Sequence, residues 1–399
     1  MRTSARVVLS LSASRSFDRG CLRGIARFLR IHGPWDIVQC EPPQLASEAT
    51  AAAAAIGTQR LGVIGAVRQT DLTYPLSGGH LRPIIIDVGG EFCNRPRGQP
   101  LPSDVAVVVD IDPAAVAHAA ANHFLERHFA HFAFCGRADS EQSEQCRDAF
   151  ARYLGARNHA VAVFGKLDGA GVEDVAALVS WLKTLPRPLA VLACDDARGR
   201  QVIQACARAD IAVPEEVSVL GIGDEPLICE LSHPTLSSVR PDARAIGFRA
   251  ATVLAEMMQG GPAPVGPLLV PPVGVVTRHS TELAAIEDPV VARAMHVIRA
   301  EAVHGLNVEE LLQHLTVSRA TLERRFTKAL GHSPKDEILR LRLDRAGELL
   351  RETDYNLAQI ATLCGFKTAA HLSVTFKAKF GVSPGHYRSS QANAQPTAD

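Results

Sequence analysis

Short apolar runs alternate with amphipathic segments from residue 6 to about residue 280. The segments between the runs follow helical spacing, and the alanine-rich stretch 49–55 also suits a helix. Regular alternation of this kind is typical of parallel sheets covered by helices. The alternation continues past a Pro-rich break at 95–102 as far as residue 164, and a second lobe follows from residue 172, so the pattern predicts two α/β lobes. The predicted strands are 7–11, 35–39, 61–66, 84–88, 105–109, 131–135, 160–164, 189–193 and 217–222, with further apolar pieces at 239 and 268–276; the predicted helices are 20–32, 114–126, 142–154, 172–183, 197–209 and 243–258.

The pattern changes after Ser280, where strand-like runs stop and helical periodicity continues to Tyr387. A chain of 399 residues is longer than one hydrophobic core usually organises. We therefore predict an α/β domain over residues 1–284 and an all-helical domain over 285–390. Residues 391–399 are small and polar without periodicity, and we expect them to form a disordered tail.

The helical segment repeats one arrangement twice. Asn307 precedes the first of two short helices, and Ser318 caps the second. About fifty residues later the pair recurs, with Gly365 in its turn, and Pro334 opens a longer helix between the pairs. The spacing predicts two helix-turn-helix units around a connector.

Charge and cysteine content narrow the class of protein. Hydrophobic residues make up 47% and charged residues 21% of the chain, as in an ordinary globular protein. The net charge is zero, yet segment 288–390 carries roughly +4, which favours nucleic-acid binding there. Nine cysteines without a CxxC pair, eight of them in apolar stretches, predict buried thiols in a reducing cytoplasm. Without a signal-peptide pattern or a long apolar stretch, we expect no membrane segment.

Catalytic and metal-binding motifs find no support in the sequence. The four histidines His118, His123, His128 and His131 lack the spacing that would place them on one helix face as metal ligands. Phosphate-loop and nucleophile-elbow motifs are absent, and the glycine pair at 221 and 223 lacks the third glycine of a dinucleotide loop. We expect no metal, no cofactor and no enzymatic activity.

Residues 318–326 (SRATLERRF) and 376–388 (FKAKFGVSPGHYR) closely resemble the AraC-type DNA-binding domain. The resemblance implies that both second helices enter successive major grooves of an operator in double-stranded DNA, about one helical turn apart. The simpler alternative is a solvated basic helix bundle. Agreement between the duplication, the turn spacing and the terminal motif favours DNA binding.

The AraC-type resemblance also implies which residues meet DNA. In the first unit Ala320, Glu323 and Arg324 would face bases, because arginine pairs with guanine and glutamate accepts from cytosine, while Arg319 and Arg325 would lie nearer phosphates. The second unit offers no polar group at its matching positions, which predicts thymine-methyl contacts from Ala369, Ala370 and Val374. The full predicted set is Ser318, Arg319, Ala320, Thr321, Glu323, Arg324 and Arg325, with Lys367, Thr368, Ala369, Ala370, His371, Val374 and Lys377.

Two positions depart from the AraC-type pattern. Leu312 stands where the first unit usually has a small residue, and Thr316 where its turn often has glycine. We expect both to be accommodated by small adjustments of the helix crossing.

Residues 214–222 (PEEVSVLGI) and 236–239 (LSSV) resemble the effector domain of the LacI type. Its fold is the periplasmic-binding-protein architecture, a hinged pair of α/β lobes. Here we expect the hinge near residues 110, 240 and 275 and the ligand between the carboxyl ends of the strands of both lobes. The fold class expected for the chain is this two-lobed α/β domain followed by an all-α domain with two helix-turn-helix units.

The whole chain resembles the xylose-operon activator family through 8–19 (VLSLSASRSFDR), 196–198 (DAR) and 294–299 (AMHVIR). The resemblance implies a transcription activator, forming a homodimer, that responds to a monosaccharide effector, xylose or a related sugar, and acts on RNA polymerase. The competing hypothesis is a solute-binding module or carbohydrate enzyme whose helical tail mediates assembly. An export signal or a paired-carboxylate catalytic site would favour that alternative, and the sequence contains neither pattern.

Sugar sites combine charged groups that bind hydroxyl pairs with an aromatic face. Arg147 matches the effector-domain arginine that binds hydroxyls, whereas Asp112 and Asp196 could equally be helix caps, and Asp18 could cap the helix 20–32. Gly223 stands where this effector type usually places an acidic ligand residue, so either Asp224 moves into the site or one hydroxyl contact is missing. The predicted ligand-binding residues are Ser14, Arg15, Phe17, Asp18, Gly89, Asp112, Arg147, Asp196 and Asp224.

Overall fold

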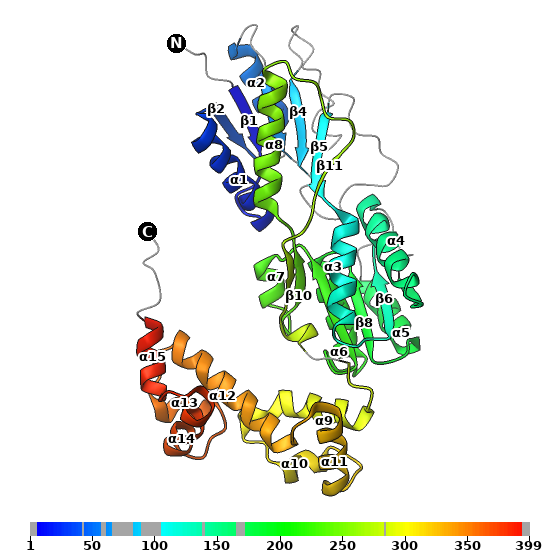
Figure 1. Cartoon of the computed structure of the whole chain (residues 1–399), viewed down its shortest axis with the longest axis vertical. Coiled ribbons are helices and arrows are strands. Elements are labelled where there is room, and N and C mark those ends of the chain that lie inside the picture. Colours follow the sequence, from blue (N-terminus) through cyan, green and yellow to red (C-terminus); the bar gives the residue numbers. More distant parts are fainter. Residues whose placement is uncertain are drawn as a thin grey trace. The chain divides into compact units, whose positions relative to one another are not determined.

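The computed structural model divides the chain into two compact units, Met1–Ala285 and Ile286–Asp399 (Figure 1). The first unit is α/β and the second is entirely helical in its described part. The structure describes residues 6–41, 44–56, 61–65, 83–88, 105–137, 140–164, 172–282 and 285–392.

Lobe 1 of the first unit is built on a six-stranded parallel sheet in the order β11-β5-β4-β3-β1-β2. Both faces of its central strands are buried, which explains why these strands read as continuous apolar runs. The strands are β1 (Arg6–Ser10), β2 (Asp36–Cys40), β3 (Leu61–Gly65), β4 (Ile84–Val88), β5 (Val105–Ile111) and β11 (Leu268–Val270).

Helices α1 (Ser16–His32) and α8 (Ala243–Met258) cover one face of this sheet, and α2 (Leu45–Ile56) packs against the other. Helices α1 and α8 approach closely at Gly24 and Gly247. A Cβ at Gly24 would lie 2.1 Å from the Arg244 carbonyl oxygen, and one at Gly247 would lie 2.0 Å from the Cys21 carbonyl oxygen. Only glycine fits this crossing.

Lobe 2 carries a second six-stranded sheet in the order β12-β10-β9-β8-β6-β7, parallel except for the antiparallel pair β10 and β12. Helices α3 and α4 contribute to the core on one face of the sheet, and α5 and α6 to the core on the other. The elements are β6 (His131–Cys135), β7 (Val161–Phe164), β8 (Leu189–Ala193), β9 (Val217–Ile222), β10 (Ser237–Arg240), β12 (Gly274–Val276), α3 (Pro113–Leu125), α4 (Glu141–Gly155), α5 (Val172–Thr184), α6 (Asp196–Arg208) and α7 (Pro226–Glu230).

The apolar run at 268–276 is two strands rather than one. Strand β11 pairs with β5 in lobe 1, whereas β12 pairs with β10 in lobe 2. Pro271 and Pro272 lie between them, and proline cannot donate to a strand ladder. Hydrophobicity alone could not reveal that this segment changes sheets.

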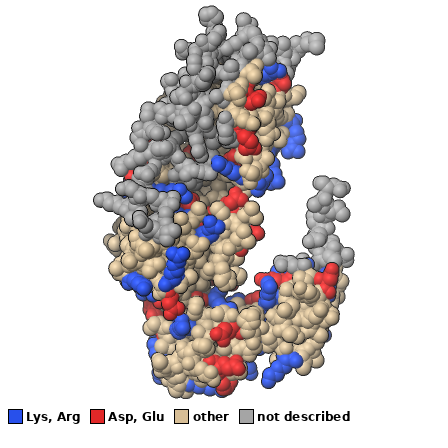
Figure 2. Space-filling model, turned by 180° about the vertical axis from the view of Figure 1, so that it is seen from behind, with Lys and Arg blue, Asp and Glu red and all other residues tan. Residues whose placement is uncertain are grey.

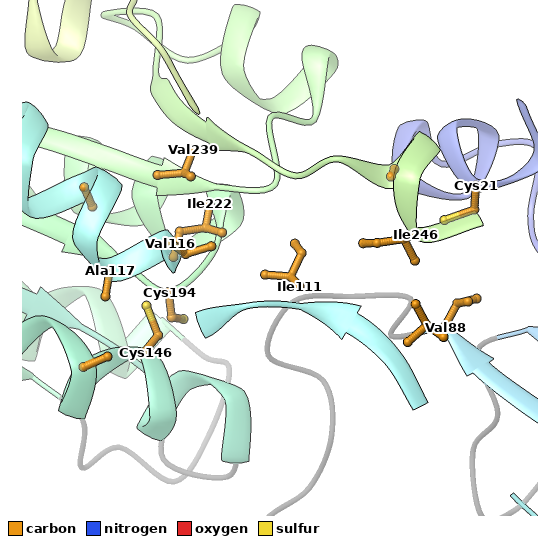
Figure 3. Close-up of a cluster of buried hydrophobic side chains, with 14 of the residues drawn as sticks. Cys21, Val88, Ile111, Val116, Ala117, Cys146, Cys194, Ile222, Val239 and Ile246 are labelled. Atoms are coloured by element: carbon orange, nitrogen blue, oxygen red, sulfur yellow. The ribbon is translucent and has the colours of Figure 1, made fainter. Parts of the chain in front are cut away.

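Within the described residues the chain passes between the two sheets at three places, after β5, after β10 and after β11. One hydrophobic core continues across this junction, where Ile111, on β5, lies between apolar side chains of lobe 1 and lobe 2 (Figure 3). Val88 and Ile246 lie on one side of it, and Val116 and Ile222 on the other.

Capped helices form the second unit. Ser333 caps the long helix α12, while Asn307 and Asn356 form capping boxes at the first helix of each short pair. Helix α15 extends to Ala392, past the point where sequence periodicity stops. The helices are α9 (Pro289–Glu301), α10 (Val308–Gln313), α11 (Arg319–Leu330), α12 (Pro334–Glu352), α13 (Leu357–Leu363), α14 (Ala369–Phe380) and α15 (Pro384–Ala392).

The structure confirms the predicted fold class, a two-sheet α/β unit followed by a helical unit with two helix-turn-helix pairs. The eight cysteines in the described part are buried and free, and Cys93 lies outside it. Among the described residues, no helix has both the length and the apolar character needed to span a bilayer. The same residues contain no group of three or more histidine, cysteine or carboxylate side chains placed to hold a metal ion.

Candidate effector site and nucleic-acid interface

Asp18 shapes the loop that follows β1. Its buried carboxylate accepts a hydrogen bond from the Ser12 amide at 2.9 Å, and the Ser12 and Ser14 hydroxyls lie 2.7 Å apart. Asp18 is not the N-cap of α1, a position that Arg15 occupies without a side-chain capping bond. Ser14 is exposed, while Arg15 and Phe17 are half-buried, and Phe17 packs against the lobe 1 core.

Asp196 holds the loop after β9 in place. Its carboxylate accepts from the Ser238 hydroxyl at 2.5 Å and from the Glu225 amide at 2.8 Å. Burial raises the pKa of Asp196 to about 6, against the lowering effect of these two bonds. The cap of α6 is the neighbouring Asp195, which accepts from the Arg198 amide. Asp196 is therefore a buried support for the loop and not a helix cap.

Asp224 directs its carboxylate to two arginines of lobe 2. Arg240 donates from Nε at 2.5 Å, and Arg278 forms an ion pair at 2.8 Å. The Asp224 backbone is left-handed at φ 51°, and its amide donates to the Ser238 hydroxyl at 2.9 Å. Of the two alternatives for the missing acidic residue, movement of Asp224 into the ligand site would require this carboxylate to leave Arg240 and Arg278.

The remaining predicted ligand residues lie in simpler surroundings. Asp112 caps α3 by accepting from the amides of Ala114 and Ala115. Arg147 is half-buried on α4 and pairs with the exposed Asp148 at 2.8 Å. Gly89 lies outside the described residues. Sugar binding by this predicted set stays a prediction.

Two contacts that sequence reasoning missed join the lobes directly. Glu225 precedes α7 in lobe 2, and its Oε2 accepts from the Ser16 hydroxyl at 2.6 Å and from the Ser16 amide at 3.2 Å in lobe 1. Gln142 on α4 donates to the buried Asp110 at the end of β5 at 2.5 Å. Glu225 could have been found as the next acidic residue after Asp224. Gln142 carried no signal, because only the fold brings it to β5.

In the first recognition helix, α11, the arginines have different surroundings. Arg319 pairs with Glu309 at 2.7 Å and with Glu323 at 3.0 Å, and hydrogen bonding to Glu323 and the charges of both carboxylates raise its pKa. Arg325 donates to Asp288, the cap of α9, at 2.6 Å. Arg324 is exposed and has no hydrogen bond or ion pair within the described part. Ala320 and Ser318 are exposed, and Ser318 caps α11 through Thr321.

The second recognition helix, α14, exposes an apolar patch between two lysines. Val374 is 70% exposed, and Ala370 beside it is exposed as well. Lys367 and Lys377 are also exposed. Exposure leaves these side chains free to meet DNA, and the thymine-methyl and phosphate contacts expected of them stay a prediction. The other predicted residues of this unit are Thr368, which caps α14, the half-buried Ala369 and the exposed His371.

The two turns differ in backbone. Gly365 has φ +71°, whereas Thr316 in the first turn does not enter the left-handed region. The first turn therefore avoids the conformation for which glycine would be needed. Leu312 is half-buried on α10, and nothing in the structure shows a cost for it.

Helix α12 is hydrogen-bonded to the segment between α9 and α10. Arg342 donates to the carbonyls of Ala302 and Leu306 at 2.7 and 2.8 Å, and burial lowers its pKa. Such bonds fix the connector relative to the segment that enters α10. Figure 2 shows basic and acidic side chains mixed on one face of the helical unit, so this face is not uniformly basic.

A two-lobed effector domain joined to a tandem helix-turn-helix domain defines a DNA-binding transcription regulator. Residues 121–281 match the periplasmic binding protein-like domain family, and residues 311–390 match the helix-turn-helix domain family. The chain belongs to the family of xylose operon regulatory proteins, which confirms the resemblance seen in the sequence.

The family assignment rests on relatives that match this chain over nearly their full length. The chain is 31% identical to the xylose operon regulatory protein of Haemophilus influenzae over 395 residues, 96% of this chain and 98% of the relative. It is 29% identical to that of Escherichia coli strain K12, with 96% of each chain covered. The solved structure of the xylose-binding transcription activator xylR matches with a TM-score of 0.72 and 26% identity, over 98% of this chain and 99% of that one.

Proposed function

We propose that this regulator is switched by a monosaccharide, D-xylose or a close relative, bound between the two lobes of its first unit. The main support for this proposal is that the chain matches a xylose operon regulatory protein over nearly its full length. The geometry supports it, because Ser16 at the start of α1 and Asp110 near the end of β5, both in lobe 1, form hydrogen bonds with Glu225 and Gln142 of lobe 2. Carboxylates, amides and hydroxyls placed in this way suit a ligand rich in hydroxyl groups.

The segment by which the chain leaves the first unit is held by buried polar contacts. Thr281 Oγ1 lies 2.8 Å from His123 Nε2 and donates to the Ser237 hydroxyl at 2.8 Å, while Arg127 donates to the Thr281 carbonyl. A shift of lobe 2 would therefore move the start of the linker. Sugar binding that favours one arrangement of the lobes would supply the free energy for the switch.

We further propose that the protein works in the cytoplasm as a homodimer, activates transcription through contact with RNA polymerase and catalyses no reaction. The family of regulators to which it belongs supports a role on DNA. A twofold arrangement of binding units is the common solution for operators with repeated half-sites. Sedimentation of the full chain with and without DNA tests the dimer.

The proposed function is tested with the purified full chain in two assays. Thermal denaturation against a panel of pentoses and hexoses should show stabilisation by one sugar, roughly 2.7 kcal/mol at about 100 times its dissociation constant. Gel shifts with DNA from the regulator's own promoter region should change with that sugar. If neither the denaturation temperature nor DNA affinity responds to any sugar, a monosaccharide switch is wrong.

A solute-binding module or carbohydrate enzyme with an assembly tail is not favoured by the comparisons. It predicts sugar binding without specific DNA binding. The gel shift of the full chain distinguishes the two hypotheses, because only a regulator retards its operator in competition with excess unrelated DNA.

A further inference from the structure

Residue 223 cannot supply an acidic ligand in this chain. Gly223 has φ +127°, a conformation that residues with a side chain rarely adopt. A Cβ built there would lie 3.1 Å from Asp196 Oδ2. An acidic side chain would meet both backbone strain and the charge of Asp196, so the acidic group of the usual effector pattern has no place at this position.

Asp224 does not replace it. Both of its carboxylate oxygens are engaged, Oδ2 by Arg240 and Oδ1 by Arg278, and its side chain is 5% exposed. Releasing this buried carboxylate toward a ligand would break its ion pair with Arg278, whose side chain is only 16% exposed, and that loss is costly.

The Glu225 side chain contacts lobe 1, whereas the Asp224 side chain pairs with arginines of its own lobe. Its half-buried carboxylate crosses from lobe 2 to lobe 1, where Oε2 accepts from the Ser16 hydroxyl at 2.6 Å and from the Ser16 amide at 3.2 Å. Its backbone amide is fixed by Asp196 at 2.8 Å, and the same carboxylate of Asp196 is held by Ser238. These hydrogen bonds fix the loop after β9 in a conformation that directs the Glu225 side chain toward lobe 1.

We propose that Glu225 is the acidic effector-binding residue of lobe 2, in place of the residue missing at 223, and that Ser16 occupies its carboxylate until a ligand hydroxyl takes over. The inference rests on the proposed function and names the group that recognises the sugar. Ser16 belongs to the segment that also contains the predicted ligand residues Ser14, Arg15 and Phe17. A sugar bound there would donate a hydroxyl hydrogen to Glu225 Oε2, while the Ser16 hydroxyl turns to another acceptor. A hydroxyl-to-carboxylate bond is charge-assisted and stronger than a bond between neutral groups.

The test is isothermal titration of D-xylose into the full chain, and of whichever panel sugar stabilises it most. Glu225→Gln keeps the size of the side chain but removes its charge, and should weaken sugar binding by about tenfold or more. Glu230→Gln is the matched control at the end of the same short helix, where the side chain is exposed and has no partner in the described structure. It should bind like the unmodified chain.

Ser16→Ala separates a ligand residue from a simple latch between lobes. If Glu225 binds the sugar, removing the competing hydroxyl leaves sugar affinity unchanged or raises it by a few fold, while Glu225→Gln lowers it. Equal losses in both variants would overturn the proposal, since they would show that only the contact between Glu225 and Ser16 matters. Sugar affinity of Glu225→Gln within about twofold of the unmodified chain would overturn it as well.

The unmodified chain separates this inference from the proposed function. If it binds a sugar and the variant series fails, only the role of Glu225 is wrong. If it binds no sugar of the panel, the monosaccharide switch is wrong and the role of Glu225 falls with it. Operator binding and the denaturation temperature without sugar, measured for each variant, show that a loss of affinity is not a loss of folding.

Discussion

Arg325 of the recognition helix α11 donates to the carboxylate of Asp288 at 2.6 Å, and the same carboxylate caps α9 through the amides of Val290 and Val291. Partial burial raises the pKa of Asp288, but hydrogen bonds from Arg325 and from the two amides outweigh it, so the net shift is downward. One side chain thus begins the helical unit and orients its first recognition helix.

These two roles of Asp288 can be separated by substitution. Asp288→Asn keeps a capping oxygen and loses the ion pair, so it should lower the free energy of unfolding by less than about 1 kcal/mol. Asp288→Ala loses both and should cost roughly 1–2 kcal/mol. Urea denaturation of the full chain, followed through the transition of the helical unit, measures the difference. Equal losses would mean that the cap contributes nothing measurable.

Arg324 and Lys377 should differ in how they contribute to DNA binding. Arg324 is exposed and unpaired within the described structure, so Arg324→Ala should cost about 1–3 kcal/mol on the operator and relax preference at one base pair. Lys377→Ala should weaken binding to all sequences alike and reduce the salt slope by about 1. Gel shifts on operator and unrelated DNA at several salt concentrations test both. A uniform loss for Arg324→Ala would place it at a phosphate.

Gly365 should not tolerate a side chain. Its φ is +71°, and a Cβ would lie 2.8 Å from the Gly305 amide nitrogen and from the Val303 carbonyl oxygen. Because these are backbone atoms that cannot move aside, Gly365→Ala should lower the free energy of unfolding by on the order of 2 kcal/mol or more. It should also weaken operator binding by the second helix-turn-helix pair. Gly385→Ala is the control: nothing lies within 4 Å of its Cβ position, and it should be neutral or slightly stabilising. Thermal denaturation compares the two.

His123 should make the stability of the first unit depend on pH. Burial, together with the positive charge of Arg127, lowers the pKa of His123 from 6.5 to about 3. The neutral ring therefore contributes stability that is present above about pH 6.5 and is lost as the pH falls toward 3. Between pH 8 and pH 5 the loss should be on the order of 2 kcal/mol.

The comparison that isolates this effect uses His123→Gln, which has no titrating group. Urea denaturation at pH 8 and pH 5 should show a smaller loss of unfolding free energy for the variant than for the unmodified chain. Identical pH dependence of the two proteins would contradict a buried neutral His123 beside Thr281.

Much of the fold could be predicted because its signals are local. Continuous apolar runs identified strands such as β8 and β9, and the fifty-residue repeat, with its cap at Ser318 and its second turn at Gly365, identified both helix pairs. The site was harder to predict. Asp196 was a candidate for good reason, since it follows a strand, but its role as a buried support depends on Ser238, which lies 42 residues further along the chain.

Hydrophobic periodicity, helix caps and family motifs are read from a few neighbouring residues, and so the sequence by itself determined the class of the protein, its order of elements and its two helix-turn-helix pairs. The tertiary structure decided which of several acidic side chains reaches the other lobe. Asp224 and Glu225 are neighbours of similar chemistry, yet Arg240 and Arg278 occupy the first while the second reaches Ser16 in the other lobe. The partners of a carboxylate are set by which strands and loops pack beside it, and that packing is a property of the folded chain.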